Sequence, residues 1–191
     1  MTIFACALLA VGQTASAAQA GSQDAGAPQA GIDQALLARA NAGDMAAQVA
    51  VGESYEAGKV VPRDGKLAAE WYQKAADKGD VDGEIHLAAL YRDGGKDFPR
   101  DMAQAAAWYQ KAAEQGDVTA QGMMGTLYSM GQGVEQNYVE AYYWLDLAAS
   151  VKGPKQAQYA AYRQMMGAHI TADELAVVQG REAKWKVAHP R

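Results

Sequence analysis

The stretch WYQKAADKGD, from Trp71 to Asp80, returns as WYQKAAEQGD at Trp108 to Asp117. Eight of the ten positions are identical, and a weaker copy, WLDLAASVKG, begins at Trp144. The three tryptophans are 37 and 36 residues apart. A fixed period of this length is typical of solenoids built from helical hairpins, so the repetition decides the fold class.

Each copy of this stretch carries apolar residues at positions i, i+3, i+4, i+7 and i+8. This spacing predicts an amphipathic helix with a wide buried stripe, in which the tryptophan packs into the core. An Asp or Asn lies seven residues before each tryptophan, where its side-chain oxygen can cap the helix start. These expected caps are Asp64, Asp101 and Asn137, and the first stripe is Ala68, Trp71, Tyr72, Ala75 and Ala76.

A second helix precedes this one in every repeat and can be aligned on a tyrosine. Small residues lie three positions before the tyrosine, where they allow a neighbouring helix to approach closely. A glycine three positions after it is suited to a left-handed helix end. The tyrosines are Tyr55, Tyr91 and Tyr128, the small residues are Gly52, Ala88 and Gly125, and the terminal glycines are Gly58, Gly94 and Gly131.

Both ends of the repeat array have helices of their own. Residues 32–40 have helical apolar spacing and predict an N-terminal capping helix. Pro154 opens a helix, and Thr171 with Glu174 forms a capping box that starts a last helix to about Val187. We expect the first of these to bury Tyr159, Tyr162, Met165 and Met166, and the last to dock through Leu175, Val178, Ala183 and Trp185.

The first 17 residues predict an export signal. An apolar run from Ile3 to Val11 is followed by Ala15-Ser16-Ala17, an A-x-A cleavage site, with cleavage after Ala18 as the alternative. No Lys or Arg precedes Arg39, so the usual basic start is missing or the true start lies upstream. Residues 18–31 predict a flexible linker. The mature chain is then expected to be periplasmic or secreted and to have no membrane span. Cys6, the single cysteine of the full sequence, would be removed with the signal.

The residues of copies one and two resemble the Sel-one-like repeat, a relative of the tetratricopeptide repeat. The shared pattern is A-x-x-x-L-G-x-x-Y-x-x-G followed by D-x-x-x-A-x-x-W-Y-x-K-A-A-x-x-G, and it covers roughly residues 40–153. The third copy departs from it at Leu145, Leu147 and Gly153. The resemblance implies an all-α, right-handed superhelical solenoid that scaffolds protein complexes, often in bacterial envelopes and signalling. We place the solenoid at 32–188, with repeats at about 44–79, 80–116 and 117–153 and C-terminal capping helices at 154–187.

Composition and residue spacing argue against nucleic-acid binding, metal binding and catalysis by this chain. The net charge is −5, whereas nucleic acid and anionic membranes call for a basic face. Asp80, Asp82 and Glu84 lack the spacing of a calcium loop. The chain has three histidines, and no Ser or Cys has a His and an Asp at recognisable motif spacing. We therefore predict no catalytic residue, no cofactor and no metal site.

Three functions remain open from the sequence. The first is an interaction scaffold that binds a protein or peptide in the groove expected on the concave side, by analogy with tetratricopeptide repeats. Its acidic first repeat and neutral third repeat suggest a peptide with a basic end. The second is an envelope hydrolase, such as a β-lactam-hydrolysing relative, and the third is a structural spacer. The predicted groove residues are Glu53, Glu56, His86, Ala89, Arg92, Thr126 and Ser129.

Overall fold

A computed structural model describes residues 31–190, and this range holds nine helices and no strand. The predicted export signal and all but the last residue of the predicted linker lie outside the described residues. The helices are α1 (Gln34–Asn41), α2 (Met45–Ala57), α3 (Gly65–Ala76), α4 (Val81–Asp93), α5 (Met102–Glu114), α6 (Val118–Met130), α7 (Tyr138–Ala149), α8 (Gln156–Gly167) and α9 (Ala172–Ala188).

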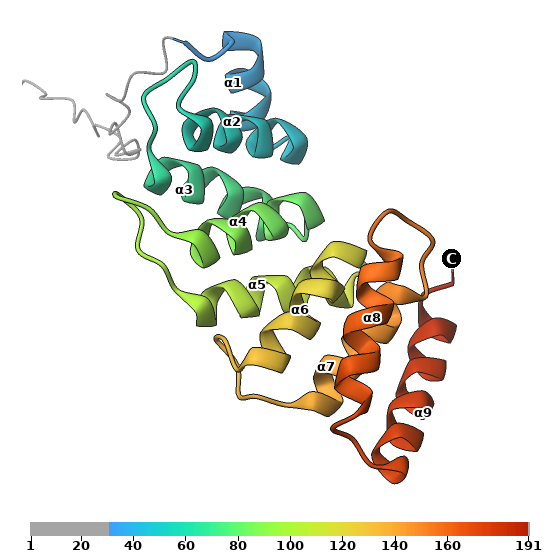
Figure 1. Ribbon diagram of the computed structural model, residues 1–191. Coiled ribbons are helices and arrows are strands. Elements are labelled where there is room, and N and C mark those ends of the chain that lie inside the picture. Colours follow the sequence, from blue (N-terminus) through green and yellow to red (C-terminus); the bar gives the residue numbers. More distant parts are fainter. Residues whose placement is uncertain (1–30, 191) are drawn as a thin grey trace, which may run out of the picture.

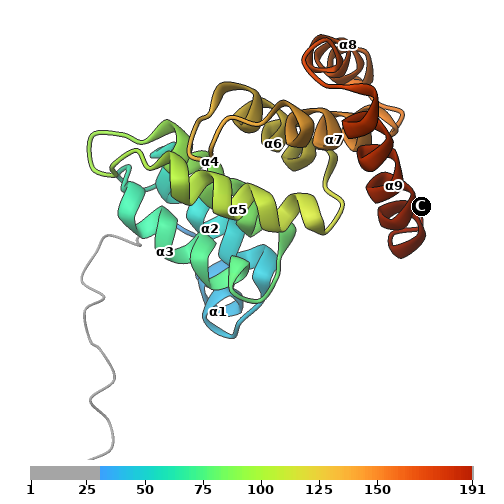
Figure 2. The same ribbon diagram turned by 90° about the horizontal axis from the view of Figure 1, so that it is seen from below.

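Helices α1 to α8 form a solenoid in which each packs mainly against its neighbours in the chain (Figure 1). Three hairpins, α2–α3, α4–α5 and α6–α7, are the three repeats, and α1 packs on α2. Helix α8 packs on α7, while α9 also packs on α7. Figure 2 shows α8 and α9 at the end of the molecule away from α1. The predicted all-α solenoid is therefore confirmed.

Side-chain caps set the beginning of almost every helix. Asp64, Asp101 and Asn137 each accept hydrogen bonds from two backbone N–H groups at the start of α3, α5 and α7, which confirms the predicted caps. Thr171 and Glu174 form the predicted capping box at α9. Helix α8 is the exception in the described chain, because no side chain caps its first turn.

In the first and third hairpins, a side chain of the second helix packs directly against a glycine of the first helix. A Cβ on Gly52 would lie 2.5 Å from the Tyr72 ring, and a Cβ on Gly125 would lie 2.5 Å from Leu145. The three repeat tryptophans are also buried, as predicted. Because these contacts leave no room for a methyl group, glycine is required at both positions despite its cost of about 1 kcal/mol inside a helix.

The Gly52→Ala substitution is expected to lower the free energy of unfolding by about 1–3 kcal/mol, because the added methyl group overlaps the Tyr72 ring. The matched control is Gly180→Ala in α9, where a Cβ would meet nothing within 4 Å. That change is expected to stabilise the protein by about 0.5–1 kcal/mol. Urea unfolding of both variants measures the difference, and two changes of equal sign would contradict the packing described.

Loops between hairpin helices contact the start of the preceding repeat's second helix. The loop before α5 is one residue longer, and its Phe98 lies over Gly65, whose added Cβ would be 2.8 Å from Phe98 Cβ. The Asp97 carboxylate there accepts from the Gly65 N–H at 2.9 Å. One repeat later the large and small residues are exchanged. The glycine, Gly133, is in the loop and lies against the backbone of Met102 at the start of α5.

The C-terminal helices differ from the prediction. Tyr159 is buried as expected, but Tyr162 and Met165 are 41% and 60% exposed, so their assignment to the core was wrong. The reason is that α9 packs on α7 instead of covering α8. Helix α9 docks through Val178, with Leu175 and Trp185 half-buried, while Ala183 is exposed contrary to expectation.

Ionic contacts hold the two C-terminal helices to α7. Arg163 of α8 pairs with Asp146 of α7. Glu182 of α9 is buried beside Asp146 and pairs with Lys186. Burial and the neighbouring Asp146 raise the pKa of Glu182. Arg181 of α9 pairs with Glu140 of α7, so each of the two C-terminal helices has one ion pair to α7.

A buried carboxyl in the second repeat occupies a position held by glutamine in the other two. Gln48 Nε2 donates to the Ala40 carbonyl at 3.0 Å, and Gln121 Nε2 donates to the Ala113 carbonyl at 3.2 Å. Glu84 takes this position in α4, is 3% exposed and accepts from Gln115 Nε2 at 2.9 Å. Burial raises the pKa of Glu84 above its ordinary value of 4.5.

The Glu84→Gln substitution is expected to stabilise the protein at neutral pH by about 1 kcal/mol, because it removes a buried charge and restores a donor. The folded state holds the proton of Glu84 more tightly than the unfolded state. Wild-type stability therefore falls as pH rises from about 4.5 through the raised pKa, and the variant's advantage grows over the same range. Thermal unfolding of both proteins between pH 4 and 8 measures this, and a pH-independent difference would contradict it.

Candidate functional site

The predicted groove residues lie on one continuous surface made by α2, α4, α6 and α8, here named the even-helix face. Glu53 Oε1 of α2 is 3.4 Å from His86 Nε2 of α4. Arg92 Nη1 of α4 is 3.9 Å from the Met123 sulfur of α6. Residues of α6 and α8 then meet around a shared cavity. The four helices therefore present their side chains edge to edge along the solenoid.

Two of the predicted residues on this face, Glu56 and Arg92, form hydrogen bonds within their own hairpins. Tyr72 Oη of α3 donates to Glu56 Oε2 at 2.6 Å, and Arg92 Nη1 donates to Tyr109 Oη of α5 at 3.0 Å. Burial raises the pKa of both tyrosines. Arg92 is also paired with Asp93 at 2.7 Å. In repeats one and two, the side chain after the aligned tyrosine thus secures the phenol of its own hairpin.

Glu53 is the most available charged group among the predicted residues, with 54% of its side chain exposed. His86 stacks on the Tyr72 ring, with the centroids 5.0 Å apart, and lies at the edge of the face as expected. Ala89 is half-buried beside them. The first two repeats therefore offer one open carboxylate, a histidine edge and a small apolar surface.

The third repeat lacks the phenol contact. Leu145 stands where the other repeats have Tyr72 and Tyr109, and Ser129 stands where they have Glu56 and Arg92. A cavity of about 250 Å³ opens there between α6 and α8. It is lined by Thr126, Ser129, Met130, Leu145, Tyr162, Met165 and Met166.

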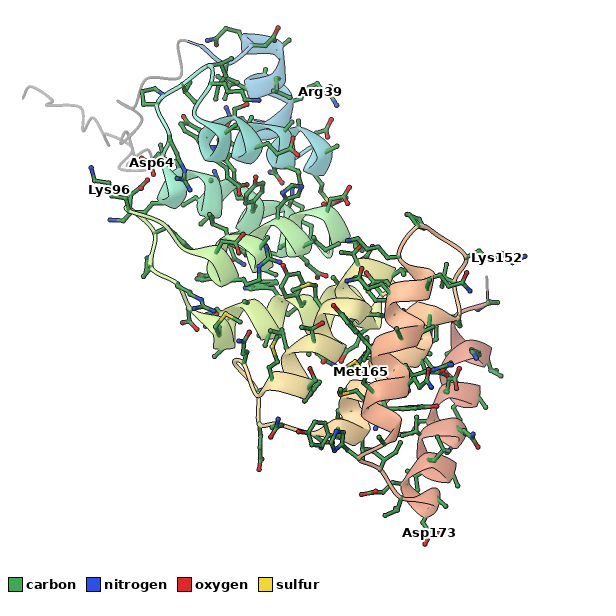
Figure 3. All side chains as sticks on the ribbon, viewed as in Figure 1. Arg39, Asp64, Lys96, Lys152, Met165 and Asp173 are labelled. Carbon is green, nitrogen blue, oxygen red and sulfur yellow. The ribbon has the colours of Figure 1, made fainter. Side chains whose placement is uncertain are left out.

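Sequence reasoning found Thr126 and Ser129 but missed the other walls of this cavity. Figure 3 shows Met165 on the side of α8 that is nearer to α6. The signal that could have revealed the cavity was the loss of tyrosine at position 145 together with exposed apolar residues on a terminal helix. The methionines were instead assigned to the core, which holds for Met124 but is wrong for Met165.

The described residues contain no group of three or more His, Cys, Asp or Glu side chains that could hold a metal ion. The hydroxyls of Ser54, Ser129 and Ser150 each donate to a backbone carbonyl. These three hydroxyl protons are therefore used in local backbone contacts.

The Sel1 repeat family profile matches three consecutive segments, residues 46–80, 81–117 and 118–150, which together are more than half of the chain. The chain belongs to the Sel1 repeat family. Proteins with Sel1 repeats generally act as scaffolds for protein–protein interaction. No curated protein matches the sequence significantly.

Two of three similar solved structures support the same fold. A Sel1 repeat protein from Oxalobacter formigenes is 29% identical, with a TM-score of 0.57, over 65% of this chain and 92% of its own. Cysteine rich protein B of Helicobacter pylori is 18% identical, with a TM-score of 0.50, over 65% and 89% of the two chains. The protective antigen c5321 of uropathogenic Escherichia coli is 23% identical, with a TM-score of 0.43, over 79% and 47%. Between residues 31 and 190, no helix is long and apolar enough to cross a membrane.

Charge reversal should separate the open carboxylate from the structural one. Glu56→Lys is expected to lower the free energy of unfolding by about 1.5–3 kcal/mol, because Tyr72 loses a charged acceptor. Glu53→Lys is the matched surface control and should stay within about 0.5 kcal/mol of wild type. Chemical denaturation followed by circular dichroism measures both, and equal losses would contradict the assignment of Glu56 to the hairpin.

Proposed function

We propose that this Sel1 repeat protein is a non-catalytic adaptor of the bacterial envelope that holds a protein partner on its even-helix face. The observation that carries the proposal is the continuity of this face across four helices. Glu53 lies exposed toward one end, and an apolar cavity opens at the other. A surface of this length suits an extended or helical segment of another protein better than a small molecule.

The charges of the face favour a partner segment with basic residues. Glu53 and Glu56 contribute two carboxylates, whereas Arg92 and Asp93 of α4 form an ion pair and add no net charge. The third repeat and α8 add no exposed charge around the cavity. Electrostatic complementarity of this kind supports the basic-ended peptide expected from the sequence.

The envelope location rests on the sequence of residues 1–17. An apolar run with an A-x-A site is typical of exported proteins. A mature chain cut after residue 17 retains no cysteine. The hydrolase alternative gains nothing from the similarity to cysteine rich protein B, because 18% identity extends to the fold alone.

Site-specific photo-crosslinking in the native host tests the binding face. A photoreactive residue at position 89, on α4, is expected to give a discrete crosslinked protein species from the envelope fraction. The control is the same residue at exposed position 70 on α3, which should give none. Crosslinks of equal yield from both positions, or none from position 89, would overturn the proposed face. N-terminal sequencing of the same sample checks export and the cleavage site.

A further inference from the structure

The cavity lined by Thr126, Ser129 and Met130 of α6 and by Tyr162, Met165 and Met166 of α8 is open and apolar. We propose that it is an anchor pocket, which receives one apolar side chain of a polypeptide segment that carries cationic residues farther along its length, toward α2. This inference rests on the proposed function and names the partner chemistry that the face selects.

The pocket exists because the third repeat departs from the first two at matching positions. In repeats one and two, a tyrosine and its charged partner fill the space beside the hairpin: Tyr72 with Glu56, and Tyr109 with Arg92. Leu145 and Ser129 are both shorter, and neither can form the phenol contact. The volume that they leave is open to solvent on the face where α6 meets α8.

The chemistry of the lining favours an apolar occupant. The Thr126 hydroxyl donates to the Gly122 carbonyl at 3.0 Å, and the Ser129 hydroxyl donates to the Thr126 carbonyl at 2.8 Å. Both hydroxyl protons are thus used within α6. A polar side chain entering the pocket would lose its hydration and find little compensation, whereas an apolar one would gain from burial.

The rim of the pocket is unusually apolar for a protein surface. Three of the seven large hydrophobic side chains exposed in the described chain lie around it: Met130 at 52%, Tyr162 at 41% and Met165 at 60%. Methionine side chains are flexible and adapt to the shape of a bound group. The volume of about 250 Å³ is below the roughly 300–1,000 Å³ of typical small-molecule sites, so it suits a single side chain.

Charge complementarity identifies what lies farther along that segment. No charged residue lines the pocket, and Arg163, the one charged residue of α8, is engaged by Asp146. The α2 end of the face carries Glu53 and Glu56, whereas the Arg92–Asp93 pair of α4 adds no net charge. A segment with an apolar anchor at the pocket and lysine or arginine toward α2 therefore meets attraction at one end and no repulsion at the other.

The test rebuilds the pocket of the third repeat as the filled contact of the first. The double variant Leu145→Tyr, Ser129→Glu recreates the Tyr72–Glu56 pair, and Gly125 faces residue 145 as Gly52 faces Tyr72. A second variant, Met165→Glu, puts a charge at the rim on a residue that is 60% exposed and does not depend on repacking. Val177→Ser is the control, because Val177 is an exposed apolar residue of α9 that does not line the pocket.

The probe is a phage-displayed library of random twelve-residue peptides, selected on the purified mature protein. The strongest peptides are then synthesised and titrated by fluorescence anisotropy. Enriched peptides are expected to combine one Leu, Met or Phe with Lys or Arg several residues away. Their affinity should fall at least tenfold in the double variant and in Met165→Glu, and should stay within twofold in Val177→Ser. Circular dichroism checks that each variant is folded.

Enriched peptides without an apolar residue, or with no basic residue, would overturn the inference, and so would a failure to enrich any peptide. Selected peptides that bind the two pocket variants as tightly as wild type would also overturn it. In that last case, crosslinking from position 89 would still support a partner on the even-helix face. The pocket and the proposed adaptor function can therefore fail separately.

Discussion

The structure depends on the fit of a large side chain against a backbone that has no Cβ. Where Gly52 meets Tyr72, the ring occupies the space that any other residue would fill, and the two helices of the hairpin approach closely. The phenol then extends through the hairpin and donates to Glu56 on the even-helix face. One residue therefore sets both the spacing of the helices and the arrangement of charge on the surface.

This coupling explains why a substitution in the core alters the recognition surface. Leu145 keeps the apolar contact with Gly125 but does not reach Ser129, so the hairpin packs while its outer side is left open. The first two repeats combine stability with an ionic surface, whereas the third gives up the polar contact and exposes apolar area. Protein surfaces that expose such grouped apolar side chains are commonly interaction sites.

The repeat pattern predicted the hairpins well because each position could be compared with a copy one period away. The caps at Asp64 and Asn137 follow from local rules of helix geometry, and so does the close helix approach at Gly52 and Gly125. The terminal helices had no such copy, and their placement depends on contacts among α7, α8 and α9. The predicted burial of Met165 failed for this reason, because apolar spacing shows which residues share a helix side but not whether another helix covers it. Likewise, the bond between Glu56 and Tyr72 joins residues of two helices and is not visible in either pattern alone.

The exchanged sizes at the rim of the solenoid give the array a direction. Phe98 fits over the start of α3 because Gly65 is there, and Gly133 fits over the start of α5 beside Met102. If the second and third hairpins traded places, a phenyl ring would meet a helix start without glycine. The hairpins are therefore not interchangeable, because each loop fits only the helix start that it contacts in this order. Divergence of the repeats by recombination would be restricted to exchanges that move a loop together with the helix start beneath it.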